Sequence, residues 1–122
     1  MTKVLIADDE PSILLSLEFL FKKQGYKVFI ARDGQEAIQL FDQENPDVPI
    51  LDIMMPQVDG YEVCQHAKTK FKEKEPKVVF LTAKNKETDI EEGYKYGADL
   101  YLLKPFSTKE LTKQVKTLVE GM

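Results

Sequence analysis

The sequence predicts an α/β fold in which a parallel sheet carries helices on both faces. Apolar runs of strand length alternate five times with segments of helix length along the 122-residue chain. The runs are continuous rather than alternating, which is typical of strands covered on both sides. Strict alternation of strand and helix favours parallel strands joined by right-handed crossovers.

The first two strand–helix units occupy the first third of the chain. Lys3–Ala7 is an apolar run, and Pro11 follows at a position that the first turn of a helix tolerates. Gly25 marks the end of that helix, Tyr26–Ala31 forms the second strand, and Gln35–Gln43 forms the second helix. The first helix is supported by apolar residues at helical spacing: Ile13, Leu14, Leu17, Leu20 and Phe21.

The remaining units repeat this order. The expected segments are strand Asp47–Ile53, helix Tyr61–Lys72, strand Lys77–Thr82, helix Lys86–Tyr96 and strand Asp99–Leu103. The last helix opens with Ser107 and Glu110 at the spacing of a capping box, and Asp59 is expected to cap the third helix. At this length, five such units favour a flavodoxin-like doubly wound sheet with strand order 2-1-3-4-5 and five helices on both faces.

Composition limits the classes of protein that need consideration. The chain is 43% hydrophobic and 31% charged, and its length suits one domain spanning residues 1–122. A net charge of −4 gives no general attraction to nucleic acid or anionic membrane, and Lys109, Lys113 and Lys116 are expected to form the solvated face of the last helix. A single cysteine, Cys64, excludes an internal disulfide. We expect a cytoplasmic protein that binds neither nucleic acid nor membrane.

Polar residues stand at four strand ends. Asp8 and Asp9 follow the first strand, Asp52 the third, Thr82 the fourth and Lys104 the fifth. In a doubly wound sheet, ligands bind beyond the carboxyl ends of the strands, where the strand order reverses. The fold therefore brings three carboxylates, a hydroxyl and an ammonium into one shallow site.

These residues resemble those of a receiver domain of two-component response regulators, of the free-standing chemotaxis or sporulation type. The resemblance rests on the acidic pair, on "DIMMPQVDG", on Thr82-Ala83 and on "YLLKPF", and it covers almost the whole chain. It implies that Asp52 accepts a phosphoryl group from a sensor histidine kinase or a histidine phosphotransfer protein. A carboxylate can do this unaided by a base, because it is ionised at neutral pH.

The resemblance also implies a divalent cation, Mg²⁺ or a substitute such as Mn²⁺. Asp9, Asp52 and the backbone carbonyl of Met54 would bind it directly, and Asp8 would bind it through a water. The cation explains why three acids stand together, since their mutual repulsion favours binding a positive charge.

The other roles follow from the same resemblance. Lys104 pairs with Asp52 or its phosphate, the Thr82 hydroxyl bonds a phosphoryl oxygen, and Ala83 leaves room for the group to enter. Thr82 and Tyr101 form the switch, with Tyr101 turning in from solvent when Thr82 moves. A target protein, or a second copy of the chain, would bind the face made by the fourth helix, the fifth strand and the fifth helix. Such a domain is not an enzyme that acts on other molecules. It catalyses only its own phosphorylation and dephosphorylation.

Simpler interpretations exist for each residue. Asp8 and Asp9 can be ordinary acids at a helix start, as Glu10 is expected to be, and Thr82 and Lys104 can be plain strand-end residues. His66 lies in mid-helix, where a surface or packing role is favoured over phosphate transfer. The four motifs together favour the receiver.

Three rival functions fit the sequence less well. A flavin-binding module needs a loop that attracts phosphate after the first strand, whereas "DDEPS" repels one. A hydrolase with an aspartyl-phosphate intermediate needs a second acid soon after Asp52, where Ile53 and Met54 stand instead. A degenerate receiver would lack one of the residues that take part in phosphoryl transfer, whereas this chain has all of them. Both a free-standing receiver and a fragment of a longer regulator remain open.

Pro49 is the one departure from the resemblance. It lies within the third strand, a central strand in this fold, where a proline removes a ladder donor and an aliphatic residue is usual. A bulge, a lost hydrogen bond and a sequence error are all compatible with it.

Overall fold

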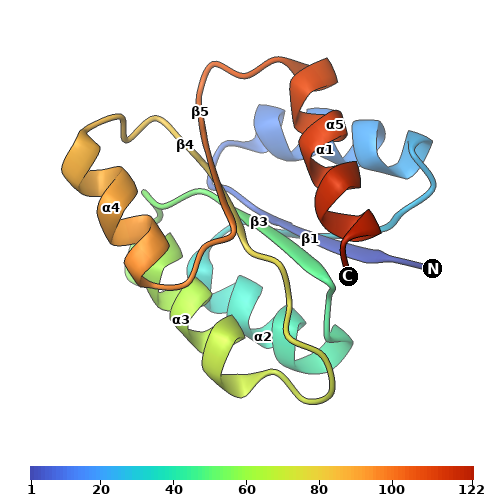
Figure 1. The fold of residues 1–122 in the computed structure, drawn as a ribbon, viewed down its shortest axis with the longest axis horizontal. Coiled ribbons are helices and arrows are strands. Elements are labelled where there is room, and N and C mark those ends of the chain that lie inside the picture. The colour runs from blue at the N-terminus through green and yellow to red at the C-terminus, as the bar shows by residue number, and fades with distance from the viewer.

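The computed structural model describes residues 1–122 as a five-stranded parallel sheet with helices on both faces (Figure 1). The strands are β1 (Lys3–Ala7), β2 (Lys27–Ala31), β3 (Val48–Leu51), β4 (Val79–Thr82) and β5 (Leu100–Leu103). Their order is β2-β1-β3-β4-β5 and every neighbouring pair is parallel, which confirms the predicted doubly wound topology.

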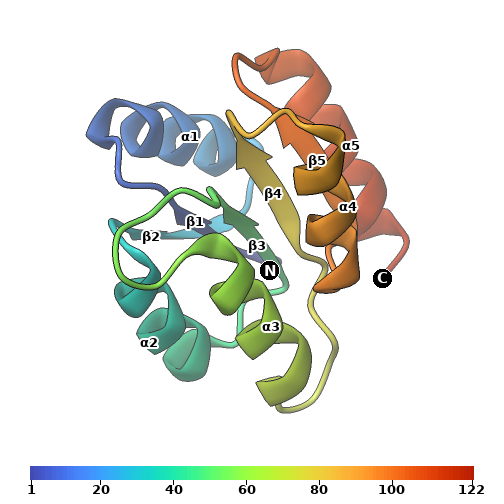
Figure 2. The same ribbon diagram turned by 90° about the vertical axis from the view of Figure 1, so that its left-hand side faces the viewer.

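The helices form one layer on each side of the sheet. They are α1 (Pro11–Lys23), α2 (Gly34–Glu44), α3 (Gly60–Lys70), α4 (Glu87–Lys95) and α5 (Thr108–Glu120). Helices α1 and α5 cover one face, and α2, α3 and α4 cover the other, as the two perpendicular views show (Figure 2). All ten predicted elements are present, with ends that differ by a residue or two from the expected ones.

The apolar core has two halves, one on each face of the sheet. In β1, Leu5 and Ala7 pack toward α2 and α3, whereas Val4 and Ile6 pack toward α1 and α5. All four are at most 1% exposed. Continuous apolar strands are therefore required here, because successive side chains enter different halves of the core.

Pro49 causes no bulge. β3 pairs one-to-one with β1 through Val48, Pro49, Ile50 and Leu51, with Pro49 opposite Leu5. The N–H of Asp52 donates to Ala7 on β1, and N–H groups alternate in direction along a strand, so the position of Pro49 faces β4. The β3–β4 ladder begins one residue later, at Ile50. The Lys77 N–H still donates to the Asp47 carbonyl in front of this ladder, so Pro49 interrupts the β3–β4 pairing by one missing donor. Of the three possibilities, a lost hydrogen bond fits the structure and a bulge does not.

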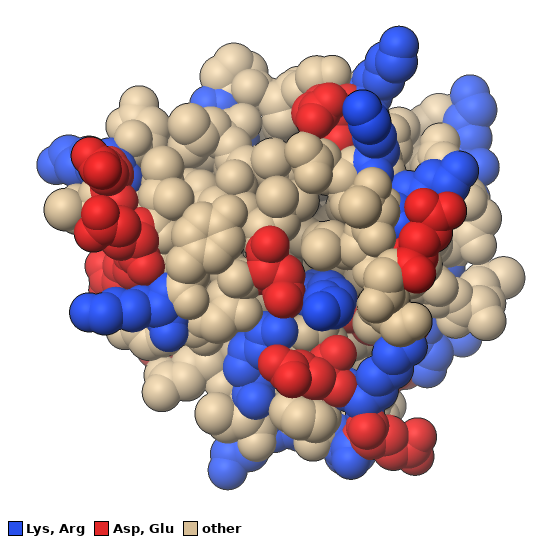
Figure 3. All heavy atoms as spheres, in the orientation of Figure 1, with Lys and Arg blue, Asp and Glu red and all other residues tan.

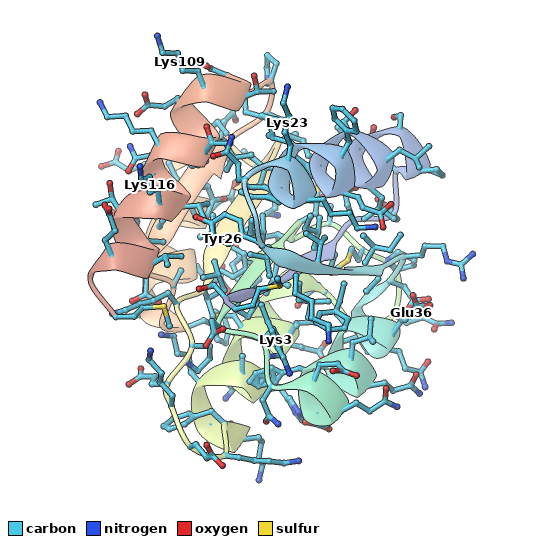
Figure 4. All side chains as sticks on the ribbon, turned by 90° about the vertical axis from the view of Figure 1, so that its right-hand side faces the viewer. Lys3, Lys23, Tyr26, Glu36, Lys109 and Lys116 are labelled. Carbon is cyan, nitrogen blue, oxygen red and sulfur yellow. The ribbon has the colours of Figure 1, made fainter.

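Helix ends and surface charges agree with the sequence. Asp59 accepts a hydrogen bond from the Glu62 N–H, and Ser107 accepts one from the Glu110 N–H. Acidic and basic side chains are interspersed over the face shown in Figure 3. Lys109 and Lys116 are exposed on the outer side of α5 (Figure 4). The helices are all too short or too polar to cross a lipid bilayer.

Candidate functional site

The site lies at the carboxyl ends of β1, β3 and β5, and the loop after β3 shapes it. This loop folds back on itself, because the N–H groups of Met55 and Gly60 both donate to the Ile53 carbonyl. A Cβ on Gly60 would overlap the Asp52 carbonyl oxygen and lie 2.7 Å from Ile53 Cα. Only glycine allows α3 to begin this close to the strand end that carries Asp52.

Replacing Gly60 by alanine should therefore disturb both fold and site. Because the obstacle is backbone rather than a mobile side chain, the variant should lose about 1–3 kcal/mol of unfolding free energy, as overpacked sites do. Urea denaturation measures this loss. Gly121→Ala is the matched control, because a Cβ there meets nothing closer than 3.6 Å. Equal stability of the two variants would contradict the assigned role of Gly60.

Three carboxylates meet at this edge of the sheet. Each of Asp8, Asp9 and Asp52 offers an oxygen, and these oxygens all lie within 4.8 Å of one another. Asp8 and Asp52 are only 2% and 5% exposed, whereas Asp9 faces solvent. The N–H of Glu10 donates to Asp8 at 2.9 Å, and the N–H of Met54 donates to Asp52 at 3.2 Å. The two buried carboxylates are thus oriented by the loops that follow them.

Lys104 joins the two buried acids. Its Nζ lies 2.7 Å from Asp8 Oδ2 and 3.1 Å from Asp52 Oδ2. It also lies 3.4 Å from Glu10 Oε1. The sequence did not predict this contact, because Glu10 was expected to be an ordinary acid at a helix start. The ammonium therefore touches the expected acceptor residue.

Burial and neighbouring charges set the pKa values of Asp8 and Lys104. Burial, with the nearby charge of Asp52, raises the pKa of Asp8 even though Lys104 and the Glu10 N–H oppose the change. Burial by itself would lower the pKa of Lys104, but contact with Asp8 and Asp52 outweighs it and raises that pKa to about 12. Lys104 is therefore charged at neutral pH, yet one ammonium cannot neutralise three carboxylates.

The surplus negative charge fits a hard divalent cation. Carboxylate oxygens are the ligands that Mg²⁺ prefers, and the exposed Asp9 leaves a route for a cation that keeps some of its waters. Asp8, Asp9 and Asp52 are the predicted side-chain ligands, and the structure brings all three together. The role of the Met54 carbonyl stays a prediction.

Thr82 and Tyr101 are connected through one residue of the β4–α4 loop. Thr82 is fully buried, and its Oγ1 lies 3.4 Å from the Lys84 N–H. The Tyr101 hydroxyl donates to the Lys84 carbonyl at 2.8 Å. Tyr101 is only 9% exposed, so the expectation that its ring waits in solvent does not hold in this structure. The rotamer of a strand-end tyrosine depends on tertiary packing, which sequence spacing does not report.

Other residues lie where the sequence suggested. Ala83 is exposed, and Met54, whose N–H bonds Asp52, keeps 51% of its surface free. His66 contacts Asp42 at 2.7 Å and packs edge-on against Phe41, which is the surface role favoured for it. Cys64 is buried and free. Neither His66 nor Cys64 belongs to the site.

The fold is a flavodoxin-like doubly wound sheet. At the edge where its strand order reverses, Lys104 bridges two of three clustered carboxylates. A sequence profile of the response regulator receiver domain matches residues 4–116. The chain therefore belongs to the response regulator receiver domain family.

Solved structures of receivers agree over nearly the full length. The chemotaxis protein CheY4 of Vibrio cholerae is 32% identical, with 96% of this chain and 98% of that chain covered and a TM-score of 0.89. The receiver domain of the Francisella response regulator 1452 is 36% identical, with 98% of each chain covered and a TM-score of 0.88. The DrrB receiver domain, activated with BeF3, is 32% identical, with 98% of each chain covered and a TM-score of 0.89.

Proposed function

We propose that this receiver accepts a phosphoryl group on Asp52 from a phosphohistidine of a sensor histidine kinase or histidine phosphotransfer protein. The observation that carries the proposal is the contact of Lys104 with Asp52, 3.1 Å apart, beside the Asp8 and Asp9 carboxylates. Phosphoryl transfer needs placement and charge neutralisation more than covalent help from the protein. This site supplies both.

Each residue has a role in the transfer. An Asp52 carboxylate oxygen bonds to phosphorus as the bond from phosphorus to the imidazole nitrogen breaks. The imidazole keeps the electron pair and takes a proton from solvent. The Met54 N–H bonds Asp52 Oδ1 and the Lys104 ammonium bonds Oδ2, so both contacts orient the carboxylate for the attack. Lys104 neutralises the phosphoryl oxygens, and Thr82 donates its hydroxyl to one of them. Mg²⁺ bound by Asp8, Asp9 and Asp52 would supply further positive charge at the same oxygens.

A small phosphodonor tests the chemistry without the cognate kinase. Acetyl phosphate with Mg²⁺ should add one phosphate to the chain, detected by intact mass, and a chelator should prevent the addition. No added mass under any Mg²⁺ concentration would overturn the proposed function.

Mg²⁺ should also stabilise the fold. The three clustered carboxylates repel one another, and a ligand that binds only the native state stabilises it by mass action. At a free concentration tenfold above the dissociation constant, the gain is about 1.4 kcal/mol. Thermal melting with and without Mg²⁺ measures the gain, and Asp9→Ala should lose most of it. An equal shift in both proteins would contradict the assigned ligands.

The output of the switch is the face formed by α4, β5 and α5. Lys104 contacts Asp52, and the Thr82 hydroxyl is the expected partner of a phosphoryl group there. Lys84 links Thr82 to the Tyr101 hydroxyl, so phosphorylation of Asp52 has a physical route to this face. A downstream protein or a second copy of the chain would bind there. The domain acts as a phosphoacceptor and catalyses only its own phosphorylation and dephosphorylation.

A further inference from the structure

Glu10 stands at the start of α1, but its side chain does not cap that helix. It is the N-cap residue of α1, and its carboxylate accepts no hydrogen bond from the N–H groups of the first turn. Asp33, Asp59 and Ser107, at the starts of α2, α3 and α5, all make such a bond. The carboxylate of Glu10 therefore has a different role from theirs.

The side chain reaches the acidic site instead. Oε1 of Glu10 lies 3.4 Å from Nζ of Lys104, the ammonium that also contacts Asp8 and Asp52. The backbone of Glu10 is held at the same place, because its N–H donates to Asp8 Oδ1 at 2.9 Å. Glu10 thus adds a fourth carboxylate beside the cluster of Asp8, Asp9 and Asp52.

This fourth carboxylate is more exposed than the two buried ones. The side chain of Glu10 is 58% exposed, against 3% for Asp8 and 5% for Asp52. An exposed ion pair of this kind contributes little stability, so Glu10 is not needed to hold the fold together. Its charge still acts on ions that enter the site, because charges a few ångströms apart interact even in water.

We propose that Glu10 is a selectivity residue of this receiver, whose charge strengthens binding of the divalent cation and disfavours reaction with small free phosphodonors that carry two negative charges. A free donor has only its own few contacts to offset the repulsion. A phosphohistidine is brought by a protein that docks over a larger surface. Glu10 therefore directs the site toward protein donors. The inference rests on the proposed function, because it concerns the donor from which Asp52 takes its phosphoryl group.

Two small donors of different charge test the repulsion. With acetyl phosphate, which carries two negative charges at neutral pH, an Asp52 oxygen bonds to phosphorus as the bond to the acetate oxygen breaks, and acetate leaves with the electron pair. Phosphoramidate carries one net negative charge, and its protonated nitrogen leaves as ammonia with the electron pair. At saturating Mg²⁺, Glu10→Gln should speed phosphorylation by acetyl phosphate about threefold to tenfold, and phosphorylation by phosphoramidate less.

The same substitution should weaken the binding of Mg²⁺. Loss of one negative charge beside the three clustered aspartates should raise the dissociation constant, measured by isothermal titration calorimetry without phosphodonor, about threefold. Weaker metal binding together with a faster reaction identifies an effect of charge, because a disturbed site would lose both. High salt should reduce both differences.

Two further variants serve as controls. Glu73→Gln makes the same charge change in the exposed loop that enters β4 at the opposite edge of the sheet, and it should alter neither quantity. Glu10→Asp keeps the charge on a side chain one methylene shorter and should retain most of the natural behaviour.

The outcomes separate this inference from the proposed function. An acetyl phosphate rate that is unchanged or lower in Glu10→Gln, or an unchanged Mg²⁺ affinity, would overturn the role of Glu10 and leave Asp52 as the phosphoacceptor. A natural protein that gains no phosphate from either donor would refute the proposed function, and the selectivity of Glu10 would fall with it.

Discussion

Replacing Lys104 by glutamine should lower the unfolding free energy of the metal-free protein by about 3–5 kcal/mol, the usual cost of breaking a buried ion pair from one side. The ammonium lies 2.7 Å from Asp8 and 3.1 Å from Asp52, and its side chain is only 13% exposed. Glutamine keeps most of the side-chain length and removes the charge. Two buried carboxylates would then face each other with no counterion.

Urea denaturation in the presence of a chelator measures this effect. Lys113→Gln is the control, because Lys113 is exposed on α5 and its loss should change stability by no more than about 0.5 kcal/mol. Adding Mg²⁺ should restore part of the stability of Lys104→Gln, since a cation replaces the missing charge. A Lys104 variant as stable as the Lys113 control would show that the contact of Lys104 with Asp8 and Asp52 does not stabilise the fold.

The cost of Lys104→Gln should depend on pH. The pKa of Asp8 is raised in the folded state, so the folded chain binds more protons than the unfolded chain, and this group favours folding increasingly as pH falls. Removing Lys104, which opposes that rise, moves the folded pKa further upward. The variant should therefore be closer to the natural protein at about pH 4 than at about pH 8. A cost that grows on acidification would contradict the electrostatic origin.

Beryllofluoride bound at Asp52 should produce large remote chemical-shift changes between Lys84 and Lys116. The reason is that the Thr82 hydroxyl is the expected partner of a group bound at Asp52, and Thr82 contacts Lys84, whose carbonyl holds the Tyr101 hydroxyl. The changes should be weaker in Thr82→Ala. Thr117→Ala is the control, because the Thr117 hydroxyl bonds only within α5, to the Lys113 carbonyl. Remote changes concentrated on α1 and α2 would place the output face elsewhere.

Sequence periodicity predicted the elements and their order because it reports burial directly. The continuous apolar runs predicted strands that enter two core halves, and strict alternation predicted the parallel topology. The polar residues that ended the strands were found together, because the topology itself places the ends of β1, β3 and β5 at one edge.

What the sequence did not predict depends on three-dimensional contacts. Pro49 removes one donor from the β3–β4 pairing without shifting the register of β3 against β1, and the sequence alone does not show which of these effects a proline has. Tyr101 of β5 is buried against Gly93 of α4. Neither residue alone indicates this contact in the sequence. The contact of Glu10 with Lys104 joins residues at opposite ends of the chain. Such pairs are set by packing distances rather than by spacing in the sequence.

The central claim is that Asp52 is the phosphoacceptor, and intact mass spectrometry tests it most directly. After incubation with acetyl phosphate and Mg²⁺, the natural protein should carry one phosphate, and Asp52→Asn should carry none. Asp59→Asn should be phosphorylated like the natural protein, because Asp59 caps α3 on the same loop and asparagine caps equally well. Phosphorylation of Asp52→Asn to the same extent as the natural protein would contradict the account.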